Sequence, residues 1–397
     1  MIVSEKRSCP LCGHRTSNII LEFKISSFDK LHDQHQFSSC MKCGFVYNSD
    51  IHFENVLAFY ESNDDYLNEN AAGSGGTGAS DLFRYDIYLK ILKNAKLSME
   101  SQIVDVGCAK GGFVKYLNQE GFSKASGIEL DRALVDKAKG QGIPVQLGAI
   151  DSFPHLSNSI DCVCAFHVLE HLFDIESSIT EIHRILVNDG LCLVEVPNAG
   201  NYSGGRTFPH FWTLIKEHIN HFDEYSLSAT FSKGGFEVIG CFHQIIPYDN
   251  SDFGYPSLML LLRKNKGNKN LSFNTFRTAE QIKKYFKKSN NQLARLITIF
   301  QKWRNENRSV VIWGCSLELQ ILLSFTCLEQ CSIVAIIDKN PLKQGKIIHD
   351  IAVRGPELLE SITDEGVVLV CSILHSANIV KELKTLAPQL EYETITE

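Results

Sequence analysis

The sequence lacks any long apolar run, and its charge lacks a basic excess. No stretch approaches the roughly 18 consecutive apolar residues of a membrane-spanning helix, so no membrane span is expected. The opening residues, MIVSEKRSCP, contain no apolar core of the kind found in secretory signal peptides. The formal net charge is −7, whereas a protein that coats nucleic acid usually presents a basic face. We therefore expect a cytoplasmic protein with no membrane partner and no nucleic-acid partner.

Cysteine, in contrast, is abundant, and four of the 13 cysteines form a recognisable pattern. Two CxxC pairs, each followed by a glycine that suits a tight turn, supply these four thiols: Cys9 and Cys12, then Cys40 and Cys43. Four thiolates fill a tetrahedral zinc site and leave no open position for chemistry. The pattern predicts a structural Zn²⁺ in a zinc-binding lobe over residues 1–60. Three nearby histidines are interpreted as bystanders: His14, His32 and His35.

The remaining cysteines lie mostly in apolar contexts such as DCVCAF and GLCLVEV. Cysteines of this kind are typical of small core residues in a reducing compartment. The length of 397 residues, 44% of them apolar, predicts two or three domains with sizeable cores.

The segment SQIVDVGCAKGGFVKYLNQEGF predicts a strand, a glycine turn and a helix. Residues 103–106 form the apolar strand, and Gly107 and Gly111 lie in the turn, where glycine lets the backbone approach a ligand. The next strand, ASGIELD, ends in Glu129, 22 residues after Gly107. An acid at that place can accept hydrogen bonds from both hydroxyls of a ribose. The segment therefore predicts a nucleotide-binding α/β domain.

The pattern DxGxxxGG differs from the dinucleotide pattern GxGxxG. Together with GIELD it resembles motif I and the following acidic position of class I S-adenosylmethionine-dependent methyltransferases. Later segments follow in the order of that family: VQLGAIDSFP, SIDCVCAFHVLEHL, EIHRILVNDGLCLVEVPN, HFDEYSLSATFSKGGFEVIGCFH and PSLMLLLRKN. The resemblance covers roughly residues 85–265 and implies a Rossmann-like, seven-stranded, mostly parallel sheet. Another Rossmann-like enzyme is the alternative.

The same resemblance implies S-adenosylmethionine as the cofactor and assigns it eight residues. Those at the methionine end are Asp105, Gly107 and Gly111. Glu129 would hold the ribose, Ile150 and Asp151 would flank the adenine, and Phe166 and His167 would lie over the cofactor. For Asp151, a simple turn residue is the alternative.

Two further segments follow the methyltransferase core of residues 61–265. Residues 266–307 are rich in Lys, Asn and Gln, and their apolar positions recur at helical spacing, which predicts a helical linker. Its basic residues are interpreted as a solvated face, with a docking surface for an acidic substrate as the alternative. In residues 308–397, a strand ending at Gly314 and a second ending at Asp338 predict a half-Rossmann α/β domain. A turn with one glycine is poorly suited to a pyrophosphate, so no cofactor is expected there.

This three-part order, with IIDKNPLKQGKI in the last domain, resembles the sugar C-methyltransferase family. Members of that family act on nucleotide-linked keto-deoxysugars, and their last domain helps to hold the nucleotide. In that family an acid–histidine pair follows the fifth strand and the histidine is the base. Glu217 and His218 match this pair, and His171 matches a further histidine. Removing a C–H proton beside a carbonyl suits a histidine whose pKa is near neutral.

Three departures from that family keep the target atom open. A Tyr-His pair of the family reads Ile215-Lys216 here, the glycine-rich turn of the last domain reads GCSLELQ, and the substrate tyrosines are represented at best by Tyr60 and Tyr66. An O- or N-methyltransferase that uses His218 as base therefore remains open. So do an RNA or protein methyltransferase guided by the zinc lobe and a non-catalytic protein with a relic cofactor site. The sequence does not predict the oligomeric state.

Two segments near the expected site have interpretations of their own. AAGSGGTGAS, residues 71–80, predicts a flexible loop, with a lid as the alternative. In KEHINHFDEYSL, the second half predicts the start of a helix, and His221 is interpreted as structural. His167 and His171 have the spacing of a zinc-binding helix pair, but no third ligand is evident and a second metal is not expected.

Overall fold

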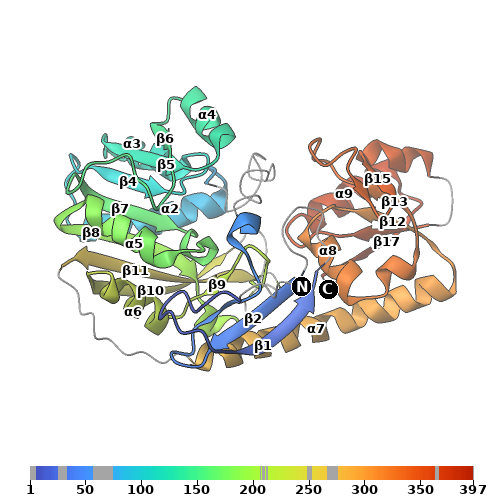
Figure 1. The fold of residues 1–397 in the computed structure, drawn as a ribbon. Coiled ribbons are helices and arrows are strands. Elements are labelled where there is room, and N and C mark those ends of the chain that lie inside the picture. The colour runs from blue at the N-terminus through green and yellow to red at the C-terminus, as the bar shows by residue number, and fades with distance from the viewer. Residues whose placement is uncertain are drawn as a thin grey trace. The chain divides into compact units, whose positions relative to one another are not determined.

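The computed structural model describes residues 6–25, 34–56, 75–205, 207, 211, 213–247, 253–265, 276–362 and 366–396 (Figure 1). The chain divides into two compact units. The first comprises residues 1–22, 35–208 and 213–284, and the second comprises residues 23–34, 209–212 and 285–397. The predicted zinc lobe and the predicted methyltransferase core both fall largely in the first unit. The boundaries of the four predicted segments stay a prediction. His32, Tyr60, Tyr66 and residues 71–74 lie outside the described residues.

A seven-stranded sheet forms the centre of the first unit. Its strands, in chain order, are β4 (Ile103–Val106), β5 (Ala125–Glu129), β6 (Val145–Leu147), β7 (Ile160–Phe166), β8 (Leu186–Pro197), β10 (Phe236–Pro247) and β11 (Gly254–Lys264). They lie in the order β10-β11-β8-β7-β4-β5-β6. The pairs from β8 to β6 are parallel, and β11 is antiparallel to both β8 and β10. All four residues of β4 are buried, as expected of a central parallel strand with both faces covered. The predicted seven-stranded, mostly parallel α/β fold is confirmed.

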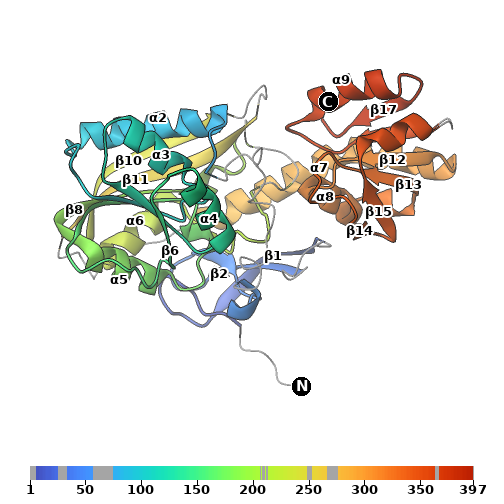
Figure 2. The same cartoon turned by 90° about the horizontal axis from the view of Figure 1, so that it is seen from above.

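Helices cover both faces of this sheet (Figure 2). The helices are α2 (Ala79–Asn94), α3 (Gly112–Gln119), α4 (Arg132–Gly140), α5 (Ile175–Ile185) and α6 (Glu224–Lys233). Side chains of α2 and α3 share one buried cluster with the sheet, and side chains of α5 and α6 share another. Aspartates fix three of the starts, because Asp131, Asp174 and Asp223 accept hydrogen bonds from backbone N–H groups of the first turn. At α6, Ser226 completes a capping box, so the predicted helix start in KEHINHFDEYSL is confirmed.

The cysteine-containing lobe has its own four-stranded sheet. Its strands are β1 (Ser17–Lys24), β2 (Gln34–Cys40), β3 (Val46–Asn48) and β9 (Asn220–His221), in that order. β9 follows the fifth strand of the central sheet by more than twenty residues and pairs with β3. Cys40, Phe45 and Tyr47 belong to the same buried cluster as Val163 of β7 and Phe231 of α6. The lobe and the central sheet therefore share one hydrophobic core.

The second unit contains another α/β sheet. Its strands are β12 (Ser309–Trp313), β13 (Ser332–Ile337), β14 (Ile347–Ile348), β15 (Ile351–Arg354), β16 (Val367–Val370) and β17 (Glu391–Thr394), in the order β14-β15-β13-β12-β16-β17. Its helices include α8 (Leu317–Phe325) and α9 (Ser376–Leu386), and the long α7 (Phe276–Asn305) contributes to both units. After β12, the backbone N–H of Cys315 donates to the Asp338 carboxylate at 2.8 Å. The predicted half-Rossmann domain is confirmed. No helix in the described part of the chain is long and apolar enough to cross a membrane.

Candidate active site

The four predicted zinc ligands lie together in the lobe. Their sulfur atoms all lie within 4.8 Å of one another, with 3.7 Å between Cys9 and Cys43 and 3.5 Å between Cys12 and Cys40. A tetrahedral ion with Zn–S bonds of about 2.3 Å places its sulfurs about 3.8 Å apart. The Cys43 thiol and burial both raise the pKa of Cys9, so a thiolate at that position needs a cation beside it. The cluster therefore fits a structural Zn²⁺.

The predicted cofactor turn lies between β4 and α3. Gly107 and Gly111 have φ values of +66° and +74°, which L side chains rarely adopt. A Cβ on Gly107 would lie 2.8 Å from Val168, so the turn packs directly against the segment that follows β7. Gly112 opens α3, and its N–H donates to the Gly75 carbonyl at 2.9 Å. The described part of the predicted 71–80 loop thus covers the start of α3.

Glu129 lies at the end of β5, beside this turn. Its carboxylate accepts hydrogen bonds from the N–H groups of Ala109 at 2.9 Å, Leu130 at 2.7 Å and Asp131 at 2.9 Å. Burial raises its pKa, and these donors oppose that rise. Burial, and then the Glu129 charge, raise the pKa of Asp105 well above its usual value. The two predicted cofactor acids therefore lie close together at the carboxyl ends of adjacent strands, where such folds bind ligands.

The other predicted cofactor residues follow β6 and β7. Ile150 is half-buried against the main core, and Asp151 is exposed in a turn closed by a bridge between Ala149 and Ser152. The Phe166 ring stacks on Tyr88 of α2 with 3.8 Å between ring centroids.

His167 belongs to a row of ionisable groups that are buried or half-buried. Its φ of +56° is unusual for a residue with a side chain, and such outliers gather at functional sites. Its Nε2 lies 3.3 Å from Glu195 of β8, and its Nδ1 lies 2.9 Å from Glu170. Glu195 is fully buried and also binds Arg84 at 2.9 Å and the hydroxyls of Tyr88 and Ser257.

Both members of the His167–Glu195 pair have perturbed pKa values. Burial alone would lower the pKa of His167, but Glu195 raises it overall. Burial alone would raise the pKa of Glu195, but Arg84 and His167 hold it well below its usual range. Arg84, Glu195 and His167 therefore form one electrostatically coupled chain.

Glu170, His171 and His218 form a cluster at the end of this row. One ligand-type atom from each of the three lies within 4.8 Å of the other two. The imidazole rings of His171 and His218 have their centroids 5.0 Å apart. Nδ1 of His171 donates to the Glu217 carbonyl at 2.8 Å, which leaves its Nε2 without a proton in the neutral ring. Oε2 of Glu170 and Nδ1 of His218 are buried and have no hydrogen-bond partner.

Two histidines of the KEHINHFDEYSL segment are held neutral. Burial, followed by the neighbouring His171 and His221, lowers the pKa of His218 well below its usual value. Burial, and then His35, lower the pKa of His221 to about 3. This differs from the near-neutral pKa expected for His218 from sequence, because that expectation did not include complete burial beside other imidazoles.

The buried His221 predicts a specific acid sensitivity of folding. Its pKa is depressed in the folded state, so below the unfolded value of about 6.5 the unfolded chain binds a proton that the folded chain excludes. The stability that His221 contributes is complete above that pH and is lost as the pH falls. Between pH 6 and pH 4, wild type should lose up to about 1.4 kcal/mol per pH unit more than His221→Gln. Urea unfolding of both proteins across this range checks the difference, and equal slopes would contradict it.

The structure brings together two of the three predicted catalytic side chains and adds residues that the sequence did not indicate. His171 and His218 lie together, whereas Glu217 contacts His171 through its backbone carbonyl. The acid beside the two histidines is Glu170, which stands within the quoted motif HVLEHL. The buried row adds residues from distant elements: Arg84, Tyr88, Glu195, Tyr255 and Ser257.

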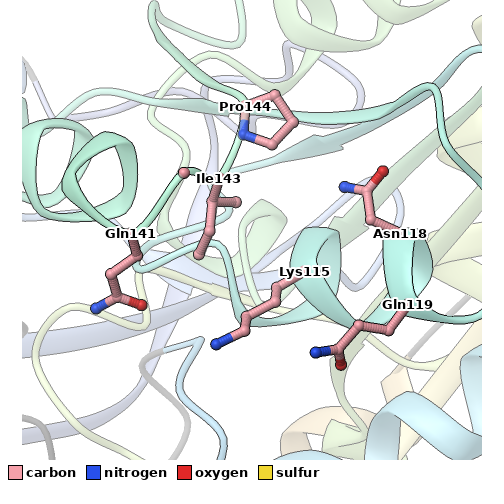
Figure 3. A pocket seen from close by; sticks show the side chains of 7 residues that line it. Lys115, Asn118, Gln119, Gln141, Ile143 and Pro144 are labelled. Carbon is pink, nitrogen blue, oxygen red and sulfur yellow. The ribbon is translucent and has the colours of Figure 1, made fainter.

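A separate hollow borders the cofactor turn from the other side, because a Cβ on Gly111 would lie 2.9 Å from Ile143 in its lining (Figure 3). It is formed by α3 and the loop that precedes β6, with these lining residues: Lys115, Asn118, Gln119, Gln141, Gly142, Ile143 and Pro144. That loop meets the amino end of β6, at the opposite edge of the parallel sheet from Glu129. The hollow is therefore not part of the predicted cofactor site.

Comparisons with known proteins agree with this arrangement. The family model described as a methyltransferase domain matches residues 81–240, and the one described as a C-methyltransferase C-terminal domain matches residues 266–389. A curated relative from Mycolicibacterium smegmatis, named "Probable S-adenosylmethionine-dependent methyltransferase", is 29% identical over 146 residues. That match covers 36% of this chain and about half, 55%, of the relative.

Two solved structures illustrate the similarity of the fold. One is an S-adenosylmethionine-dependent methyltransferase from Mesorhizobium loti, 17% identical with a TM-score of 0.37, covering 47% of this chain and 99% of that one. Another is the PH0226 protein from Pyrococcus horikoshii, 14% identical with a TM-score of 0.39, covering 52% of this chain and 98% of that one.

The two family models together span more than half of the chain, and they fall on the two α/β units in the order that the fold shows. The methyltransferase match includes the glycine turn, Glu129 and the Glu170–His171–His218 cluster. Residues 81–240 of the chain are therefore a class I S-adenosylmethionine-dependent methyltransferase domain, followed by a C-methyltransferase C-terminal domain.

Proposed function

We propose that this enzyme methylates a carbon atom next to a carbonyl group in a small molecule, a nucleotide-linked keto-deoxysugar or a related metabolite. The observation that carries the proposal is the buried cluster of Glu170, His171 and His218. Val168, which lies against Gly107, precedes Glu170 by two residues, so the cluster begins where the cofactor turn ends. The match to a C-methyltransferase C-terminal domain supports carbon as the target.

The residues around the glycine turn fit a cofactor that has a ribose and a charged amino-acid end. Gly107 and Gly111 allow close approach of the backbone, and the N-terminus of α3 favours a carboxylate. Glu129 would hold the ribose, and Asp105 would line the methionine end. We assign Ile150 and Asp151 to the adenine side and Phe166 and His167 to the face above the cofactor. S-adenosylmethionine, when bound, supplies a methyl group activated by a positively charged sulfur.

His218 is proposed as the general base. Because its pKa is depressed, the ring is free of a proton at neutral pH and can accept one. In that step the substrate C–H bond breaks, an N–H bond forms on the imidazole, and the electron pair moves to the carbonyl oxygen as an enolate. The unpartnered Oε2 of Glu170 can then stabilise the imidazolium, as the carboxylate does in other catalytic acid–histidine pairs. The imidazole of His171 lies beside His218, with 5.0 Å between the two ring centroids.

Two measurements on the zinc-loaded full chain test this proposal. In D₂O, the enzyme should exchange the proton next to the carbonyl of a nucleotide-linked keto-deoxysugar, followed by NMR. With labelled S-adenosylmethionine, mass spectrometry should then find the methyl group on that carbon. A methyl group found on oxygen or nitrogen, without exchange of the C–H proton, would replace C-methylation by O- or N-methylation.

The remaining alternatives give different results in cheap binding experiments. Calorimetric titration with S-adenosylmethionine should give saturable binding, and its absence would favour a relic site. Retention on RNA at physiological salt would favour a nucleic-acid substrate. The zinc lobe shares its core with the central sheet, which supports a role inside the enzyme rather than as a separate recognition module. None of the 13 cysteines, which all lie among the described residues, forms a disulfide, which agrees with a reducing, cytoplasmic setting.

A further inference from the structure

We propose that Arg7 of the zinc lobe is a positioning residue for His171 and His218, an inference that rests on the proposed function. Its backbone N–H is fixed within the lobe by the Ser49 carbonyl at 3.1 Å, and the residue is only 8% exposed. Two residues later comes Cys9, the first sulfur of the cysteine cluster. The backbone of Arg7 therefore lies in the part of the lobe that a bound metal would make rigid.

The guanidinium of Arg7 reaches the two segments that carry the histidines. Its Nη2 donates to the carbonyls of Leu172 at 3.1 Å and Phe173 at 2.7 Å, and its Nη1 donates to the carbonyl of Ile219 at 3.4 Å. Leu172 directly follows His171, and Ile219 directly follows His218. One rigid, planar group thus joins the chain just after each imidazole.

The surroundings of Arg7 hold the guanidinium in place. Its central carbon lies 4.7 Å from the centroid of the Phe173 ring and 6.0 Å from that of Tyr47 in β3. Arginine stacks on aromatic faces and offers donors in several directions, whereas lysine is a single point of charge. A lysine at this position could not bridge both segments with the same geometry.

Asn220 makes a second link from the lobe sheet to the same segment. It lies in β9, opposite Tyr47 of β3. Its side-chain N–H group donates to the carbonyls of Leu169 at 3.1 Å and Leu172 at 2.7 Å, on either side of Glu170 and His171. Arg7 and Asn220 therefore fix both ends of the turn that presents Glu170 and His171. Because Asn220 follows His218 by two residues, the pairing of β9 with the lobe sheet also fixes the backbone position of His218.

The physical consequence is that the zinc lobe acts on the rate without touching the substrate. Mispositioning a catalytic group by about 1 Å can cost a factor on the order of 10² in rate. The cofactor turn is formed by β4, α3 and Glu129, whereas the hydrogen bonds of Arg7 go to Ser49, to Leu172 and Phe173, and to Ile219. Loss of Arg7 should therefore lower kcat and leave cofactor affinity in place.

The test compares Arg7→Ala with Lys6→Met, a neighbouring loss of positive charge. Lys6 donates to Gln36 within the lobe at 2.8 Å. Arg7→Ala should lower kcat on the order of 10²-fold, with cofactor affinity and zinc content equal to those of wild type, and millimolar ethylguanidinium should restore part of the rate. Lys6→Met should match wild type. An unchanged kcat in Arg7→Ala would overturn the inference, as would an equal loss in Lys6→Met or a loss that follows zinc content.

A readout that needs no substrate separates this inference from the proposed function. With ¹⁵N-labelled histidine, the ring signals of His171 and His218 should move in Arg7→Ala, whereas the exposed His243 should not. If these signals move while wild type neither exchanges nor methylates any keto-sugar, the proposed function fails and the positioning role stands. If they do not move, the positioning role fails. Should Arg7→Ala not fold, Arg7→Lys keeps the charge, loses the bridge, and must show the same changes.

Discussion

Replacing His218 by glutamine lowers the rate of methyl transfer by about 10² to 10⁴-fold, the usual contribution of a general base, and leaves S-adenosylmethionine binding unchanged. The physical reason is the position of the ring. His218 is buried, carries an unpartnered Nδ1 and lies 5.0 Å from the His171 ring beside Glu170. Glutamine fills similar space but has no basic nitrogen. Exchange of the C–H proton in D₂O, measured without cofactor, should fall by the same factor as the overall rate.

His221→Gln is the matched control for this variant. His221 is also fully buried with a depressed pKa, but it lies in β9 against Phe37, with 4.8 Å between ring centroids, and is not a member of the Glu170–His171–His218 cluster. It should show altered stability and a much smaller loss of rate per folded molecule than His218→Gln, because it removes only a neighbour that lowers the pKa of His218. A fully active His218→Gln would remove His218 as the base. Equal losses in the two variants would show that the effect comes from folding.

The fold was largely predictable because its signals are local. Each strand of the central sheet is a short apolar run, and Gly107 and Gly111 mark the turn where an L side chain would be strained. The two-residue spacing within each CxxC pair is also a local signal, so the cysteine cluster could be predicted directly from the sequence. The helix start after His221 was predicted because Asp223 and Ser226 form its capping box within four residues.

The site was only partly predictable because its partners come from distant segments. Glu170 stands in the motif HVLEHL, yet nothing local shows that it faces His167 on one side and the two other histidines on the other. That arrangement depends on the left-handed backbone of His167 and on Asn220, which binds carbonyls about fifty residues earlier in the chain. Arg84 and Glu195 are 111 residues apart, and only the fold brings them together as a part-buried ion pair.

The segment KEHINHFDEYSL also shows what a local interpretation leaves out. Its second half was correctly predicted as a helix start, but Asn220 and His221 first form a strand with β3 of the zinc lobe. A two-residue strand has no periodicity to detect, and its partner lies about 170 residues away. Through this strand, the zinc lobe is joined by backbone hydrogen bonds to the segment that carries the proposed base, His218.

Replacing one zinc ligand, Cys12→Ser, should destabilise the whole first unit and not the lobe alone. The side chains of Cys9, Cys40 and Cys43 share a buried cluster with Ile179 of α5 and Phe231 of α6. A structural zinc contributes about 10–16 kcal/mol in zinc-finger peptides, which equals or exceeds the total stability of about 5–15 kcal/mol of a typical domain. Loss of the metal should therefore lower the Tm of the first unit by more than about 10 °C or prevent it from folding.

Cys327→Ser is the matched control for the zinc ligand, because Cys327 is a half-buried thiol like Cys12 but lies in the second unit. Metal analysis should find one zinc per chain in wild type and Cys327→Ser and none in Cys12→Ser. Calorimetry should show that Cys12→Ser shifts the unfolding transition of the first unit and leaves the second unit's transition in place. If Cys12→Ser instead loses zinc yet unfolds at the wild-type temperature, the lobe is not part of the shared core. The His171 and His218 positions would then have to be held by the central sheet alone.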